Sequence, residues 1–345
     1  MIPVSRTELS SPQLFFKSIT PLFQPKNVGG NRIFNPGTTS YQRKQLILPR
    51  LTRGEIYPTQ PFESWIALAS LRGGLQYPGD LEPIQELTPN RTYPCGFEDP
   101  RITKLGRDYH IVATGYDGNL PHIVLCTTRD FHSFSLRGEI GPRNTADKDA
   151  FFHPEIVMVN GNLKIMLYHR VSDTGNIQCA FVDKIEDLLG TEGDRFWEQE
   201  LTRLNKRTLL KSRSDTWENH IGGGVPPVKT SSGWLFIYHA AGSDGVYRGG
   251  LAMLDLNKPW RVIAKSPYPI LEPTLDHEVI GAVNNVVFPQ GAQIINEKSP
   301  DPILYLYYGG ADTNTCIAKA KLNDLISYIM QFDTEGAVLK KQKRK

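Results

Sequence analysis

Apolar residues along the chain cluster in short runs that follow a proline and a polar turn. Asp99-Pro100-Arg101, for example, leads through "KLGRD" into the apolar stretch 109–116. The residue before a proline is held in extended geometry, and strands are rich in Tyr, Ile, Leu and Val. Each such unit therefore predicts a strand, a turn and a second strand. Helical spacing is almost absent between residues 30 and 320, and only short helices are predicted, at 184–189 and 322–331.

The unit of proline, turn and strand occurs five times. Its prolines stand at intervals of 54 to 73 residues, at Pro36, Pro100, Pro154, Pro227 and Pro289. Five mostly antiparallel units of this length predict an all-β fold, a five-bladed β-propeller with short peripheral helices. A β-sandwich with similar turns is the alternative. The predicted organisation is an N-terminal extension (1–30), a propeller catalytic domain (31–320), and a C-terminal helix with a basic tail (321–345).

In a propeller, the first strand of each unit lines a central channel, so residues near the five prolines converge. We expect one mouth to collect Asn35, Asp99, either His153 or Glu155, and the segments 222–227 and 284–289. Further polar residues end the strands that follow, at Tyr116-Asp117, His169-Arg170, Tyr238-His239 and Asp312.

This mixture of carboxylates and cations suits a sugar or phosphate site. Carboxylates bond hydroxyls and transfer protons, whereas Arg and His bind anions. Aromatic side chains that could pack on a sugar face are Trp217, Trp234 and Tyr247.

Composition excludes several other classes of protein. The net charge is +3, and five positive charges lie in the last six residues, so the rest of the chain is slightly acidic and nucleic acid is not an expected partner. The four cysteines are far apart, which argues against zinc and for a reduced, cytoplasmic protein. No signal peptide and no membrane-spanning run is evident. The triple glycine from Gly222 to Gly224 is not followed by a lysine and a helix, so a nucleotide loop is not predicted.

The chain resembles glycoside hydrolase family 130, the β-mannoside phosphorylases and related inverting β-mannosidases. The resemblance rests on an ordered set of stretches from Phe34 to Asp312: "FNPG", "GFEDPRIT", "KDAFFHPE", "YHR", "IGGGVPP", "GWLFIYHA", "YRGGLAMLDL", "GAVNNVVFPQG" and "YYGGAD". It implies a five-bladed propeller. It also implies that Asp99, in the E-D-P-R motif, is the catalytic acid and passes its proton to the glycosidic oxygen through the mannose 3-hydroxyl.

In the phosphorylases of that family, inorganic phosphate attacks the anomeric carbon from the opposite face and gives α-mannose 1-phosphate with inversion. The resemblance therefore implies phosphate as co-substrate, with no metal and no other cofactor. It implies His239, in "IYH", as a phosphate ligand. A lysine usually precedes the I-G-x-G-x-P-P stretch, but this chain has His220 there; Arg170 and Lys148 are the cations that could compensate.

The remaining polar residues are assigned as follows. Asn35, Glu98, Arg101, Asp312 and Tyr247 are expected to contact substrate, although Arg101 could instead neutralise the acidic pair Glu98–Asp99. If the enzyme is a hydrolase, Glu155 or Glu218 would activate water. A non-catalytic sugar-binding propeller is the other class of function, and it would tolerate the loss of Asp99. The expected partners are a β-mannoside oligosaccharide, phosphate and, for a homo-oligomer, further copies of the chain.

Overall fold

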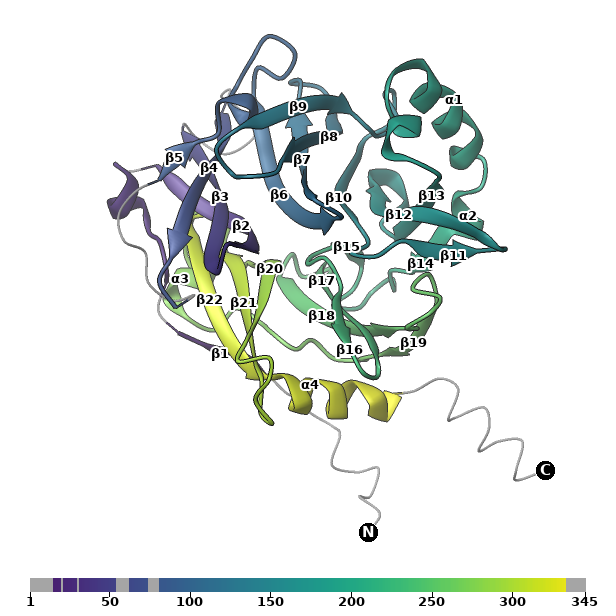
Figure 1. Ribbon diagram of the computed structural model, residues 1–345. Coiled ribbons are helices and arrows are strands. Elements are labelled where there is room, and N and C mark those ends of the chain that lie inside the picture. The colour runs from purple at the N-terminus through teal and green to yellow at the C-terminus, as the bar shows by residue number, and fades with distance from the viewer. Residues whose placement is uncertain (1–14, 20, 30, 54–61, 74–80, 333–345) are drawn as a thin grey trace, which may run out of the picture.

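The computed structural model describes residues 15–19, 21–29, 31–53, 62–73 and 81–332. Most of this chain forms antiparallel sheets that are arranged around a common centre (Figure 1). The predicted all-β class is confirmed. The predicted basic tail lies outside the described residues. No helix of the described residues is long and apolar enough to cross a membrane.

The largest sheet consists of two antiparallel groups. The first contains β2 (Arg32–Tyr41), β3 (Lys44–Arg53), β4 (Glu63–Leu71) and β5 (Glu82–Pro83). The second contains β6 (Gly96–Leu105), β7 (Asp108–Tyr116), β8 (Pro121–Thr128) and β9 (Phe134–Glu139). A single parallel register pair, Ser64 with Gly96, joins β4 to β6.

Three more antiparallel sheets follow along the chain. One contains β10 (Asp147–Phe152), β11 (Val157–Val159), β12 (Asn162–Val171), β13 (Ile177–Val182) and β14 (Thr208–Leu210). The next contains β15 (His220–Gly223), β16 (Val228–Thr230), β17 (Gly233–Ala241), β18 (Tyr247–Leu254) and β19 (Val262–Lys265). The last contains β20 (Val287–Ile295), β21 (Ile303–Gly310), β22 (Asn314–Lys321) and, at its edge, β1 (Lys17–Ser18). The segment expected as an N-terminal extension thus supplies a strand to the last sheet.

The first strands of these groups meet at the centre. β2 contacts both β20 and β6, β6 contacts β10, and β10 contacts β15. Gln290 of β20 fixes this arrangement, because its side-chain amide donates to the backbone oxygens of Asn35 (2.7 Å) and Pro100 (2.9 Å). Large buried aromatic side chains, among them Tyr168, Tyr238 and Tyr308, fill the space between neighbouring sheets.

A β-bulge interrupts four of the five first strands. The register shifts at 34–37 in β2, 98–101 in β6, 148–151 in β10 and 289–291 in β20. In three of them the bulge holds a non-glycine residue at positive φ: Asn35 (45°), Asp99 (50°) and Asp149 (58°). A bulge changes the direction in which a side chain points. Because each of these residues lies at the bulge in the first strand of its group, the three are equivalent positions of the repeat.

This equivalence corrects the proline alignment. Ala150, not a proline, follows Asp149, and Pro154 lies beyond the end of β10. His153 is buried between Tyr168 and Trp234, and it does not reach the central mouth.

The helices lie at the periphery (Figure 1): α1 (Gly190–Leu201), α2 (Leu204–Arg207), α3 (Asp276–Val279) and α4 (Leu322–Ile329). The helix predicted at 322–331 is α4 followed by the 3₁₀ turn η5 (Met330–Phe332), and the one at 184–189 is the 3₁₀ turn η4 (Ile185–Leu188). The prediction missed α1 because the helix is mostly polar. Trp197 anchors it, buried and donating its indole N–H to the carbonyl of Ile140 (2.8 Å).

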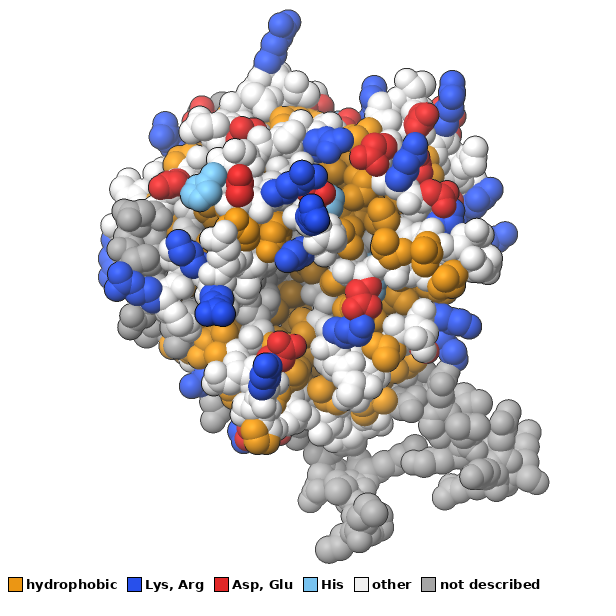
Figure 2. Space-filling model, in the orientation of Figure 1, with side chains coloured by type: hydrophobic (Ala, Val, Ile, Leu, Met, Phe, Trp, Pro, Cys, Tyr) orange, Lys and Arg blue, Asp and Glu red, His pale blue; other side chains and the backbone are white. Residues whose placement is uncertain are grey.

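Charges of both signs are interspersed over the face in Figure 2, without a broad basic area. Hydrophobic side chains are exposed toward β11 and β12 (Figure 2). The exposed hydrophobic residues in and beside these strands are Ile156, Met158 and Leu163.

Candidate active site

A cavity of about 340 Å³ opens where the first strands converge. It brings together most of the residues predicted from the sequence: Asn35, Glu98, Asp99, Lys148, Arg170, His220, His239, Tyr247 and Asp312. Its apolar lining includes Phe34, Phe62 and Phe288. The polar residues divide into an acidic group and a basic group.

The acidic group is centred on Asp99. Its Oδ1 accepts hydrogen bonds from Nδ2 of Asn35 (2.9 Å) and from Nη1 of Arg50 (3.2 Å). Arg50 also donates from Nη2 to Oε1 of Glu98 (2.8 Å). Within the described chain, Oδ2 of Asp99 receives no hydrogen bond, so this oxygen can bond a substrate hydroxyl.

Asp312 completes the acidic group. It lies in the turn between β21 and β22, with φ 47°, and lines the same cavity. Burial raises its pKa to about 6 against the opposing effect of Arg50, and the carboxylates of Asp99 and Glu98 add to the rise. Burial likewise raises the pKa of Glu98, which Arg50 opposes. Arg50 thus bonds Asp99 and Glu98 and stabilises the ionised form of Asp312 electrostatically. With a pKa of about 6, Asp312 can carry a proton near neutral pH.

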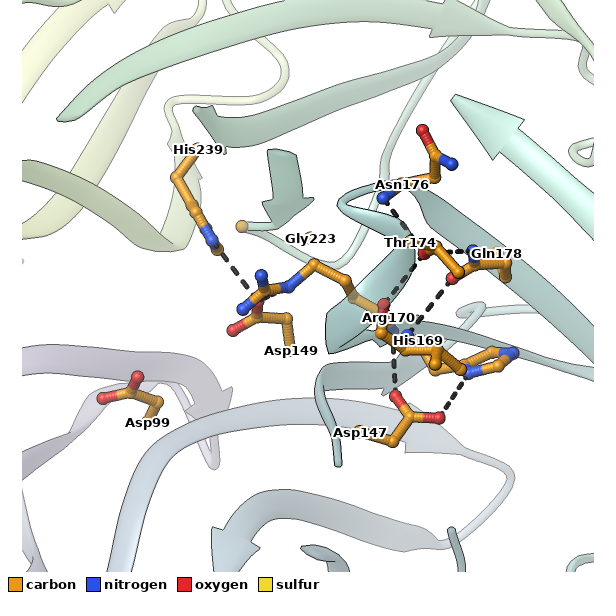
Figure 3. Close-up of polar contacts among 12 residues, drawn as sticks. Asp99, Asp147, Asp149, His169, Arg170, Thr174, Asn176, Gln178, Gly223 and His239 are labelled. Atoms are coloured by element: carbon orange, nitrogen blue, oxygen red, sulfur yellow. Dashed lines mark hydrogen bonds and ion pairs between the residues drawn. The ribbon is translucent and has the colours of Figure 1, made fainter. Parts of the chain in front are cut away.

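The basic group comes from β10, β12, β15 and β17. Figure 3 shows two of its residues, Arg170 and His239, on either side of Asp149. Its members are Lys148, Arg170, His220 and His239. Asp149 lies among them: its Oδ2 accepts from Nε of Arg170 (2.7 Å) and is 3.4 Å from Nε2 of His239. Burial alone would raise the pKa of Asp149, but Arg170, His239 and Arg101 together hold it well below its usual value.

The two histidines have different surroundings. His239 is buried and stacks on Phe288 with 4.0 Å between the ring centroids. Burial lowers its pKa, and Asp149 opposes that shift. His220 is exposed at the cavity rim, where partial burial and then the charges of Arg170 and Lys148 lower its pKa.

Arg101 does not contact the cavity, so the predicted substrate contact is wrong. Its side chain is 1% exposed and donates to the backbone oxygens of Gly223 (2.7 Å), Gly224 (3.1 Å) and Asp99 (3.2 Å). Its carboxylate partner is Asp149 (3.1 Å). Arg101 therefore stabilises the backbone around the site without lining the cavity.

Neither candidate base lines the cavity. Glu155 lies outside the cavity because it follows the far end of β10. It is 49% exposed and pairs with Lys229 (2.6 Å). Glu218 is fully buried behind Tyr238, whose hydroxyl donates to it, and pairs with Arg213 (2.6 Å) and Lys265 (3.1 Å).

Trp234 was expected to pack on a sugar, but it is buried in the core, and Trp217 packs against that core. Tyr247 is the one of the three aromatic candidates that lines the cavity.

Sequence reasoning missed Arg50 and Asp149. Arg50 is a lone cation in the apolar run "LILPRLT", and a charge inside a buried strand was the available signal. Asp149 lies in "KDAFF", where no proline follows to mark the bulge.

The cavity thus places a hydrogen-bonded carboxylate and a cluster of cations within one site. A family model described as "beta-1,4-mannooligosaccharide phosphorylase" matches residues 14–331, and the chain belongs to this family, glycoside hydrolase family 130. The enzyme class implied by the resemblance in the sequence is therefore confirmed by membership of the family.

Several relatives are phosphorylases by name. The chain is 36% identical to a 1,2-beta-oligomannan phosphorylase of Thermoanaerobacter sp., over 67% of this chain and 70% of that one. It is 32% identical to a beta-1,2-mannobiose phosphorylase of Listeria innocua, over 76% and 68%. A solved structure of a Listeria innocua beta-1,2-mannobiose phosphorylase with beta-1,2-mannobiose superposes with a TM-score of 0.73 at 25% identity, covering 91% of this chain and 98% of that one.

Proposed function

We propose that the protein is an inverting β-mannoside phosphorylase that cleaves a β-mannosyl linkage with inorganic phosphate to give α-mannose 1-phosphate. The observation that carries this proposal is the division of one cavity into the acidic group around Asp99 and the basic group around Arg170. The names of the relatives support the same activity and favour β-1,2-mannobiose as the first substrate to test.

In the proposed reaction, Asp99 is the acid. Asn35 and Arg50 orient its Oδ1, and the proton leaves from Oδ2 toward the glycosidic oxygen, by way of a sugar hydroxyl. Asp312, Glu98 and Tyr247 line the space for the mannosyl unit. Phosphate binds on the opposite side, against Arg170, Lys148, His220 and His239, and attacks the anomeric carbon as the bond to the leaving sugar breaks.

The hydrolase alternative needs a carboxylate that can activate water opposite the acid. Among the described residues, the carboxylate of the cavity on the basic side is Asp149, which is already bonded to Arg101 and Arg170 and lies against His239. Such a carboxylate is a poor base, because its partners stabilise the ionised form. A non-catalytic sugar-binding protein would have no need for the bonds that orient Asp99.

We also propose that the sheets form a five-bladed β-propeller. Five antiparallel groups follow one another along the chain, and their first strands surround the cavity, which supports a five-bladed β-propeller. In this arrangement β1 and α4 belong to the catalytic domain rather than to separate extensions. Cytoplasmic location and a homo-oligomeric state stay predictions.

The test is incubation of the purified protein with β-1,2-mannobiose, and in parallel β-1,4-mannobiose, with and without phosphate. We expect mannose 1-phosphate in the α configuration, identified by its anomeric proton in NMR, only when phosphate is present. Free mannose released at the same rate without phosphate would overturn the phosphorylase assignment.

A further inference from the structure

Asp149 connects the two groups of the active site. Its Oδ1 accepts from Nη2 of Arg101 (3.1 Å), and Nη1 of Arg101 donates to the backbone oxygen of Asp99 (3.2 Å). Its Oδ2 accepts from Arg170 and lies against His239. Figure 3 shows Asp149 between Arg170 and His239. Through Arg101, this buried carboxylate also connects these two predicted phosphate ligands to the backbone of Asp99.

The contact with Arg170 leaves the anion-binding edge of the guanidinium open. Asp149 takes the Nε–H, and the backbone N–H of Arg170 donates to Asp147 (3.0 Å). Within the described part of the chain, Nη1 and Nη2 of Arg170 have no partner, and the residue lines the cavity. A guanidinium held by one edge presents two parallel donors to a phosphate.

The surrounding backbone leaves space for this cluster. A Cβ built on Gly222 would collide with Oδ2 of Asp149 and Nε2 of His239. Asp149 itself is held at φ 58°, a conformation that aspartate adopts at a cost and that the bulge of β10 imposes.

We propose that Asp149 is a positioning residue that sets the place of phosphate relative to Asp99, by orienting Arg170 and His239 and by tying both to the Asp99 backbone through Arg101. The inference rests on the proposed function. Asp149 acts on phosphate only through its partners, because an ionised carboxylate repels an anion.

The experiment compares Asp149→Asn with Asp147→Asn. Asp147 is a matched control: it is a buried carboxylate two residues earlier on β10, but its partners are the His169 ring (2.7 Å) and the Arg170 backbone. Asparagine at 149 keeps the shape, yet its amide N–H₂ cannot accept from a guanidinium. Misplacement of a reacting group by about an ångström can cost about a hundredfold.

Phosphate binding is measured by calorimetry without turnover, and the KM values for phosphate and for mannobiose are measured separately. We expect Asp149→Asn to weaken phosphate binding by about tenfold or more, with the KM for mannobiose changed less than about twofold. Asp147→Asn should lower the melting temperature but leave phosphate binding unchanged. Equal phosphate affinity in wild type and Asp149→Asn, or equal losses in the two variants, would overturn the inference.

A double variant tests the route of action. If Asp149 works through Arg170, Asp149→Asn combined with Arg170→Lys should bind phosphate no more weakly than the poorer single variant, whereas multiplied losses would contradict it. If Asp149→Asn does not fold, Asp149→Glu, which keeps the charge but displaces it, should show the same selective loss, and an unchanged KM for phosphate would overturn the inference. A wild type that binds no phosphate would instead end the proposed function.

Discussion

Nδ2 of Asn35 donates a hydrogen bond to Oδ1 of Asp99 across 2.9 Å. The two residues are equivalent: each is the positive-φ residue at the bulge in the first strand of its group. The repeat thereby places an amide donor beside the carboxylate. Because this donor and Arg50 share one oxygen, the other oxygen stays available for proton transfer.

Asp99→Asn should abolish most of the activity while leaving the fold intact. The variant keeps the shape and an oxygen that can accept from Asn35, but its amide has no acidic proton to transfer. General acid catalysis contributes typically about 10² to 10⁴-fold, so kcat should fall within that range. Phosphorolysis rates and a thermal melting curve check this. Near-full turnover in the variant would show that Asp99 is not the acid.

Arg50→Gln should damage both activity and stability. It leaves Glu98, Asp99 and Asp312 without their shared cation, and breaking a buried ion pair costs about 3–5 kcal/mol. Because Arg50 opposes the raised pKa of Glu98 and of Asp312, the acidic limb of the pH–rate profile should move to higher pH.

The matched control for Arg50 is Arg53→Gln on the same strand, where the side chain is 70% exposed and 3.9 Å from Glu63. Its effect on the free energy of unfolding should be within about 0.5 kcal/mol. Urea unfolding and pH–rate profiles of both variants decide the point, and equal effects would contradict a special role for Arg50.

His122 should make stability depend on pH, away from the active site. Its Nδ1 bonds Glu139 (2.7 Å) and its Nε2 bonds Asp117 (3.1 Å). The hydrogen bond to Glu139 raises the pKa of His122, and the one to Asp117 adds to the rise. Burial opposes both effects, but the pKa stays above its ordinary value. A raised folded-state pKa gives stability that is fully present below the ordinary value near 6.5 and is lost as pH rises through the raised value.

His122→Gln should therefore cost more stability at pH 5.5 than at pH 8.5, as measured by urea unfolding at the two pH values. The control is His132→Gln at an exposed position. A cost that is the same at both pH values would mean that the protonated imidazole contributes nothing.

The division into strands could be predicted because each apolar run buries one face against its own neighbours, which is a local property. The position of the bulge could not. Pro36 and Pro100 mark it after Asn35 and Asp99, but Ala150 takes that place after Asp149, so counting prolines shifted attention to His153 and Glu155.

The partners of the buried charges could not be predicted from the sequence either. Asp149 differs from an ordinary surface charge only through partners that lie far away in sequence, such as His239. Arg50 stands out locally as a charge in an apolar run, but its partner Asp99 is equally distant in sequence. Family stretches, by contrast, located Asp99, Arg170 and His239 in the cavity, since these residues belong to motifs at strand ends.

His220 should limit the use of phosphate at high pH, and His220→Lys should remove that limit. The imidazole adds charge to the anion site only when protonated, and partial burial with Arg170 and Lys148 lowers its pKa, so its charge is lost as pH rises through a value below the ordinary one. A lysine stays charged to about pH 10. Arg170 is charged throughout, which predicts a weakening of phosphate binding and not its loss.

The measurement for residue 220 is the KM for phosphate from pH 5.5 to 8.5 in the wild type and in His220→Lys. The KM should rise with pH in the wild type and rise less in His220→Lys, after allowance for the titration of phosphate itself. Parallel profiles in the two proteins would mean that residue 220 does not contribute charge to the bound anion.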